Sequence, residues 1–156
     1  MRSPRASTCT GADRQKMEVA LEEARLSLSE GGIPIGAALW RGEELLGRGH
    51  NRRVQLGNPI LHGETDCLQN VGRIGSYRGT TIYSTLMPCY MCSGTIVQFR
   101  IMRVVVGEAK SFPGGREFME AHGVEVVVLE IAECAAMMQG FIEANPRLWA
   151  EDIGEL

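Results

Sequence analysis

The chain has 156 residues, of which 44% are hydrophobic and 22% charged, and it carries a formal net charge of −3 with a pI of about 5.7. This profile is typical of one globular domain with a single hydrophobic core. Proteins that bind nucleic acid usually have a high pI or a basic face, so the acidic balance argues against such a partner and favours a small or neutral one.

Hydrophobic spacing and turn residues predict helices and strands that nearly alternate. A short turn joins the first two strands into a hairpin, and a short terminal element ends the chain. The predicted helices cover residues 13–30, 61–72, 87–99, 116–122 and 131–144; the predicted strands cover 33–40, 44–51, 80–86, 102–108 and 124–130; the main predicted loops cover 52–60 and 109–115.

This alternation predicts the fold class. Strands that alternate with helices favour a three-layer α/β/α sandwich, here with a mixed five-stranded sheet that is largely parallel apart from the hairpin. We find no internal repeat or linker, so residues 13–156 are expected to form a single domain. Residues 1–12 are polar and rich in small side chains, and we expect them to be disordered. Thr10 and Asp13 have the spacing of a capping box for the first helix.

The stretch MPCYMC places Cys89 and Cys92 at the start of a predicted helix, directly after a strand. A spacing of three residues puts both thiols on one face of the helix. The free N–H groups and the dipole at a helix start stabilise thiolates. A metal site, a redox pair of the thioredoxin kind and a chance pairing all remain open from this motif alone.

Cysteine usage also predicts the compartment. Five cysteines without the spacing of a disulfide scaffold favour a reducing environment, which weakens the disulfide interpretation of Cys89 and Cys92. No secretory signal is visible behind the basic residues at the start, and no apolar run approaches the roughly 20 residues of a membrane helix. We therefore expect a cytoplasmic protein without a membrane partner.

The stretch LHGE favours the metal interpretation. His62 and Glu64 open the preceding helix, and two parallel helices that begin at one sheet edge can direct His62 and both cysteines to one point. Three N and S ligands leave the open position of a catalytic zinc. A lone histidine there is usually a cap, and a lone glutamate usually complements the helix dipole. With P-C-x-x-C further along, we instead expect Glu64 to move a proton between water and a leaving group.

H-x-E followed by P-C-x-x-C is the signature of zinc nucleobase deaminases. HGE and PCYMC resemble the cytidine deaminase superfamily, and the likeness extends over roughly residues 13–155 to one branch of it, the fungal-type cytosine deaminases. The stretches that carry this resemblance are EEARLSLSEGGIPIGAAL, LGRGHN, TLMPCYMCSGTI, VVVGE, GVEVVV and FIEANPRLWAEDIGE.

The resemblance implies a cytidine deaminase-like fold, a homodimer, and one zinc per chain held by His62, Cys89 and Cys92, with Glu64 as the proton shuttle. It implies deamination of a free base, with cytosine converted to uracil and ammonia in pyrimidine salvage. The substrate contacts that it implies are the Asn51 amide, the Gly63 backbone N–H, the Asp152 carboxylate, and the rings of Phe112 and Trp149. Trp149 as a mere anchor of the last helix, and Asp152 as a solvated tail carboxylate, are the competing interpretations.

The sequence departs from the fungal-type pattern at Thr65, Asp66, Met87 and Tyr90, close to the expected ligands. Other amino-heterocycles therefore stay open as substrates: another pyrimidine, a purine such as guanine, or a triazine-like ring. A tRNA adenosine deaminase is a further alternative, disfavoured by the acidic pI. A non-catalytic zinc protein is another, disfavoured by Glu64, because a structural site needs no proton shuttle.

Overall fold

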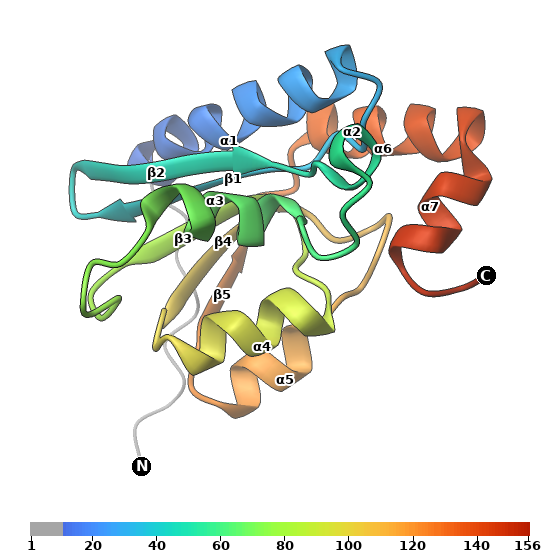
Figure 1. Ribbon diagram of the computed structural model, residues 1–156. Coiled ribbons are helices and arrows are strands. Elements are labelled where there is room, and N and C mark those ends of the chain that lie inside the picture. The colour runs from blue at the N-terminus through green and yellow to red at the C-terminus, as the bar shows by residue number, and fades with distance from the viewer. Residues whose placement is uncertain (1–10) are drawn as a thin grey trace.

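The structure, a computed structural model, describes residues 11–156 and has one five-stranded sheet with helices on both faces (Figure 1). The expected disorder of residues 1–10 and the capping role of Thr10 fall outside the described residues. The strands are β1 (Gly36–Arg41), β2 (Glu44–His50), β3 (Thr81–Leu86), β4 (Arg103–Glu108) and β5 (Glu125–Val128); the helices are α1 (Gly11–Ser29), α2 (Arg53–Leu56), α3 (Gly63–Val71), α4 (Tyr90–Gln98), α5 (Arg116–Ala121), α6 (Ala132–Ala144) and α7 (Pro146–Asp152).

The sheet is mixed, with the strand order β2-β1-β3-β4-β5. β1 pairs antiparallel with both β2 and β3, whereas β3, β4 and β5 are parallel to one another. The sequence predicted that only the hairpin is antiparallel. This prediction is wrong, because β1 is also antiparallel to β3. The crossover through α3 returns the chain to the far side of β1, so β1 lies between two strands that run in the opposite direction.

Alternating side chains of the central strands fill the two layers between sheet and helices. Val104 and Val106 pack on the side of α3, α4 and α5, while Val105 faces α1 and α6. Side chains of a strand point alternately to opposite faces, so a strand covered on both faces is apolar throughout. Figure 1 shows the same layers, with α1 and α6 on one side of the sheet and α3 to α5 on the other. These observations confirm the three-layer prediction.

Several predicted bounds differ from the structure: β1 begins at Gly36, α4 begins at Tyr90 and β5 ends at Val128, each two or three residues inside the predicted range. The first helix already includes Gly11 and Ala12, and residues 53–56 within the predicted loop form the short helix α2. Asp13 is buried, and its carboxylate accepts hydrogen bonds from the Tyr83 hydroxyl at 2.7 Å and the Arg103 guanidinium at 2.8 Å. These bonds offset the cost of burying the charge and tie α1 to β3 and β4.

The carboxyl ends of β2, β3 and β4 meet the beginnings of α3 and α4 at one edge of the molecule, where α2 and α7 also lie (Figure 1). Ligand sites of open α/β sheets usually form outside the carboxyl ends of strands. None of the helices in the described part of the chain has both the length and the apolar character needed to cross a bilayer.

Candidate active site

The starts of α3 and α4 bring one imidazole and two thiols together. His62 is the N-cap of α3, Cys89 is the N-cap of α4, and Cys92 follows one turn later. His62 Nδ1 lies 3.4 Å from Cys89 Sγ and 3.7 Å from Cys92 Sγ. Thr65 fixes the start of α3, because its hydroxyl accepts the His62 backbone N–H at 2.9 Å. The predicted convergence of the three donors is therefore present.

The spacing of these donors fits a tetrahedral zinc site. Zinc bonds of about 2.3 Å to sulfur and about 2.0–2.1 Å to nitrogen, at a tetrahedral angle, separate the two donor atoms by roughly 3.5 Å. The nitrogen–sulfur separations of 3.4 and 3.7 Å bracket that value, and all three donor atoms lie within 4.8 Å of one another. Three protein ligands leave a fourth position for water or substrate, as in catalytic zinc sites.

The two thiols have opposite pKa shifts. A hydrogen bond from Cys92 lowers the pKa of Cys89 to about 4; burial opposes this shift and the neighbouring His62 adds to it. Donation of that hydrogen bond, together with burial, raises the pKa of Cys92 well above its usual value. A metal ligand has to be a thiolate, so a divalent cation bound by both sulfurs would displace the proton of the hydrogen bond between them.

The other ring nitrogen of His62 faces the last helix. Nε2 lies 3.3 Å from Asp152 Oδ1, and the Asn51 side-chain amide donates to the same oxygen at 3.4 Å. Burial lowers the pKa of His62, but the Asp152 carboxylate and Cys89 outweigh burial and raise it to about 10. Carboxylates behind a ligating histidine fix its orientation and tautomer. The interpretation of Asp152 as a solvated tail residue is wrong, because its carboxylate is buried against His62.

Glu64 is the second residue of α3 and is buried beside the three donors. Burial, with the nearby charge of Cys89, raises the pKa of its carboxyl group. The Ser84 hydroxyl of β3 lies 2.7 Å from Glu64 Oε1 and 2.8 Å from the Leu86 carbonyl oxygen. We did not predict Ser84 from the sequence, where it reads as one more residue of a buried strand. Its hydrogen bond gives the Glu64 carboxylate a defined orientation.

A small cavity of about 20 Å³ lies beside Glu64. It has room for little more than one water molecule, which needs about 10–15 Å³ by the same measure. Phe112 and Trp149 meet edge to face across it, with ring centroids 6.0 Å apart and an interplanar angle of 87°. Its lining consists of Ile35, His62, Glu64, Leu86, Met87, Cys89, Phe112, Trp149, Asp152 and Ile153. Trp149 also belongs to the apolar cluster under α7, so it both anchors the last helix and lines the cavity.

The remaining predicted residues lie around this cavity without lining it. Asn51 is buried, and its side-chain NH2 group reaches the site through its hydrogen bond to Asp152. Its side-chain oxygen Oδ1 accepts the Arg53 backbone N–H at 3.0 Å. Gly63 is buried, and a Cβ added there would lie 3.1 Å from the Ile35 carbonyl oxygen. The hydrogen bond from the Gly63 N–H to a substrate carbonyl stays a prediction.

The residues that depart from the fungal-type pattern lie in different surroundings. Met87 is buried and lines the cavity, whereas Tyr90 is 78% exposed and points to a different surface. Asp66 lies outside the cavity, where it binds Arg52 and the backbone of His50. Of these residues, Met87 alone touches the space in which a substrate would react.

Comparisons with known proteins agree with this geometry. The family model of the cytidine and deoxycytidylate deaminase zinc-binding region matches residues 10–108. A cytosine deaminase of Candida albicans is 46% identical over 146 residues, which cover 92% of this chain and 97% of the relative. A tRNA-specific adenosine deaminase of Streptococcus pyogenes is 36% identical over 137 residues, covering 80% and 86% of the two chains. A solved structure from a study of A-to-I editing by tRNA:A34 deaminases superposes with a TM-score of 0.70 at 29% identity, over 80% of this chain and 99% of that one.

Proposed function

The chain belongs to the family of zinc-binding cytidine and deoxycytidylate deaminases, and on this premise we propose that it deaminates a free nucleobase, with cytosine as the first choice. The protein is a zinc-dependent hydrolase that acts on C–N bonds. The proposed reaction converts cytosine and water to uracil and ammonia, a step of pyrimidine salvage. The closed cavity beside Glu64 is the observation that supports a free base.

Each part of the proposed reaction has a residue beside the cavity. His62, Cys89 and Cys92 would hold the zinc, which lowers the pKa of water at its open position toward neutrality. Glu64 would take one proton from the attacking water at its carboxylate and deliver it to the ring nitrogen. It would then carry the second proton, from the hydroxyl added to the ring carbon, to the amino group, which leaves as ammonia as the C–N bond breaks and the ring carbonyl forms. General acid–base groups work best when their pKa lies near the working pH, and burial moves Glu64 in that direction.

Recognition of a flat ring would use the residues around the cavity. The Arg53 backbone N–H donates to Oδ1 of Asn51, so the side-chain amide presents its NH2 group toward Asp152 and the site. The Gly63 N–H would donate to the ring carbonyl. Phe112 and Trp149 supply apolar faces that bury a planar ligand without dictating its polar edge.

The closure of the site supports a base without its sugar. α7 contributes Trp149 and Asp152 to a cavity of about 20 Å³, which is too small for the ring itself, so α7 has to move for the base to bind. We expect α7 to close again over the bound ring, which would leave little room for an attached ribose or strand. The similarity to tRNA adenosine deaminases nevertheless makes an adenosine of tRNA the second candidate.

The test is ammonia release by purified, zinc-loaded protein. The panel contains cytosine, cytidine, adenine, guanine, an aminotriazine and a tRNA anticodon stem-loop. We expect cytosine to give the highest kcat/KM by a wide margin, since a site that hydrogen-bonds one ring edge rejects a mismatched ring by about 10⁴-fold or more. Turnover of another free base with inert cytosine would overturn the substrate but keep the reaction. A preference for cytidine or the stem-loop would overturn the free-base proposal itself.

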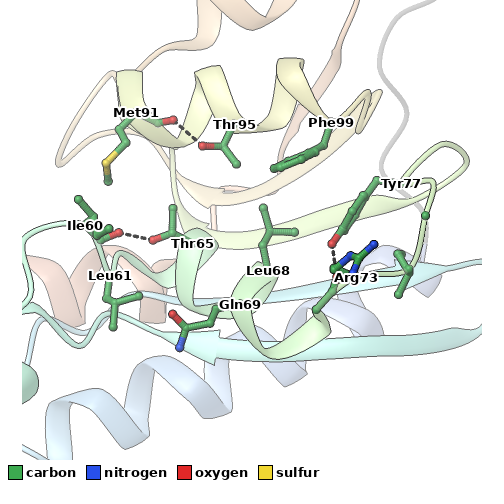
Figure 2. A pocket seen from close by; sticks show the side chains of 13 residues that line it. Ile60, Leu61, Thr65, Leu68, Gln69, Arg73, Tyr77, Met91, Thr95 and Phe99 are labelled. Carbon is green, nitrogen blue, oxygen red and sulfur yellow. Dashed lines mark hydrogen bonds between the residues drawn. The ribbon is translucent and has the colours of Figure 1, made fainter.

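We also propose a homodimer in a reducing cytoplasm. An apolar groove of about 970 Å³ runs between α3 and α4, with Met91, Thr95 and Phe99 facing Thr65 and Leu68 across it (Figure 2). Large apolar hollows on monomeric proteins usually mark interaction sites. The groove is formed by the two helices that carry the metal donors, so a second copy seated there would brace the site. The four described cysteines are free thiols, as a reducing compartment requires.

A further inference from the structure

Asp66 holds the chain on both sides of Asn51. This buried residue of α3 uses one oxygen, Oδ2, to accept the backbone N–H of His50 at 3.0 Å and the Nε–H of Arg52 at 3.0 Å. The Arg52 side chain is partly exposed, whereas the Asp66 carboxylate is almost fully enclosed. A single buried carboxylate oxygen therefore pins the residue before and the residue after Asn51.

The helix can reach this part of the chain because β2 and α3 approach closely. A Cβ added at Gly49 would lie 2.5 Å from the Cys67 nitrogen and 2.6 Å from Asp66 Oδ2, so no other residue fits there without displacing the helix. One turn further along α3, the Asn70 amide donates to the Arg48 carbonyl oxygen at 2.7 Å. β2 is an edge strand, and side chains of α3 thus pair its outer backbone groups.

Other contacts of Asn51 come from the opposite side. Its backbone N–H donates to the Ile35 carbonyl oxygen at 2.9 Å, and the Ser27 hydroxyl lies 2.9 Å from its carbonyl oxygen. These contacts fix Asn51 relative to α1 and to the segment before β1. Asp66 instead connects it to α3, the helix that begins with His62 and carries Glu64.

We propose that Asp66 is a positioning residue for substrate binding, resting on the proposed function. By pinning His50 and Arg52, it sets the position of the Asn51 amide relative to the proton shuttle on the same helix. Misplacement of a binding group by about 1 Å can cost roughly 10²-fold in rate. The two hydrogen bonds from His50 and Arg52 to Asp66, the Asp66 clamp, can therefore have a large effect on substrate binding. The Asp66 side chain does not line the cavity, and its backbone N–H donates to the His62 carbonyl oxygen at 2.9 Å as part of the first turn of α3.

The experiment compares two buried aspartate–arginine pairs. Asp66→Asn and Arg52→Gln weaken the clamp, the second while leaving the bond of Asp66 to His50. Asp13→Asn is the matched control, because Asp13 is similarly enclosed and binds Arg103 at 2.8 Å near the start of β4, remote from the site. All three variants are assayed for zinc content, melting temperature, kcat and KM on the best substrate of the panel, and for product affinity by calorimetry.

We expect Asp66→Asn to keep its zinc and to raise KM and the product Kd by about 10–100-fold, with a smaller effect in Arg52→Gln. Asp13→Asn should lower the melting temperature without changing KM. Wild-type KM and product affinity in both clamp variants, with only a lowered melting temperature, would reduce Asp66 to a structural role and overturn the proposal. If the wild type uses no free base, the proposed function fails instead, and the same comparison is then made on the nucleoside or tRNA that it does use.

Discussion

The Asp152 carboxylate of α7 lies 3.3 Å from Nε2 of His62, whose Nδ1 faces both cysteines. The last helix thus supplies the carboxylate behind a metal-binding histidine. The same oxygen accepts the Asn51 side-chain N–H, so opening of α7 would break its contacts with His62 and with Asn51, a proposed substrate contact, together.

Removal of this carboxylate should weaken zinc binding. Partners of a ligating histidine typically contribute 10–100-fold to metal affinity, so we expect about that loss in Asp152→Ala. Competition with a chromophoric chelator measures it, after elemental analysis has established one zinc per wild-type chain. Glu151→Ala, which removes an exposed neighbouring carboxylate 3.7 Å from Arg53, is the control and should bind zinc normally. Equal affinity in both variants would show that the Asp152–His62 contact does not support the metal.

Glu64→Gln should leave the fold and the zinc in place and lower turnover by about 10²–10⁴-fold, the usual contribution of a general acid–base group. The amide still accepts the Ser84 hydroxyl but cannot take a proton. Steady-state ammonia release and elemental analysis of the same sample check both halves of the prediction. Glu44→Gln, on the exposed start of β2, controls for loss of one carboxylate. Near-normal turnover with bound zinc would mean that another group moves the proton.

Phe99→Asp should convert the proposed dimer to a monomer. Phe99 is 44% exposed in the apolar groove and stacks with Tyr77 at 5.1 Å between ring centroids, so a charge there would be desolvated in the interface. Phe118→Asp is the matched control, since Phe118 is 41% exposed on α5, outside the groove. Sedimentation velocity distinguishes the two. A monomeric wild type would overturn the proposed dimer. A Phe118→Asp variant that dissociates while Phe99→Asp stays dimeric would place the contact outside the groove.

Tyr83→Phe should lower the free energy of unfolding by about 1.5–3 kcal/mol, the usual contribution of a hydrogen bond to a charged group. The substitution removes the hydroxyl that donates to buried Asp13 but preserves the ring packed between sheet and helices. Urea denaturation with an unchanged m-value measures the difference. Tyr90→Phe, at a 78% exposed position, should stay within about 0.5 kcal/mol of the wild type. Equal stability of the two variants would contradict a role of this hydrogen bond.

Local sequence determined the metal donors and the strands. His62, Cys89 and Cys92 occupy helix starts, where a few neighbouring residues fix the backbone and the spacing of the thiols follows from the helical repeat. The valines of β4 likewise predict a strand covered on both faces. These features depend on residues close in the chain, so periodicity and short motifs are enough to predict them.

Packing alone decided which distant side chains meet. Ser84 binds Glu64, Asp66 binds the neighbours of Asn51, and Asp152 binds His62, yet none of these contacts follows from spacing in the sequence. They depend on the position of β1 between β2 and β3, on the close approach of α3 to Gly49, and on the turn that brings α7 back over the sheet edge. Side-chain periodicity tells which face a residue occupies, but the residue it meets there is set by how that face packs against another element.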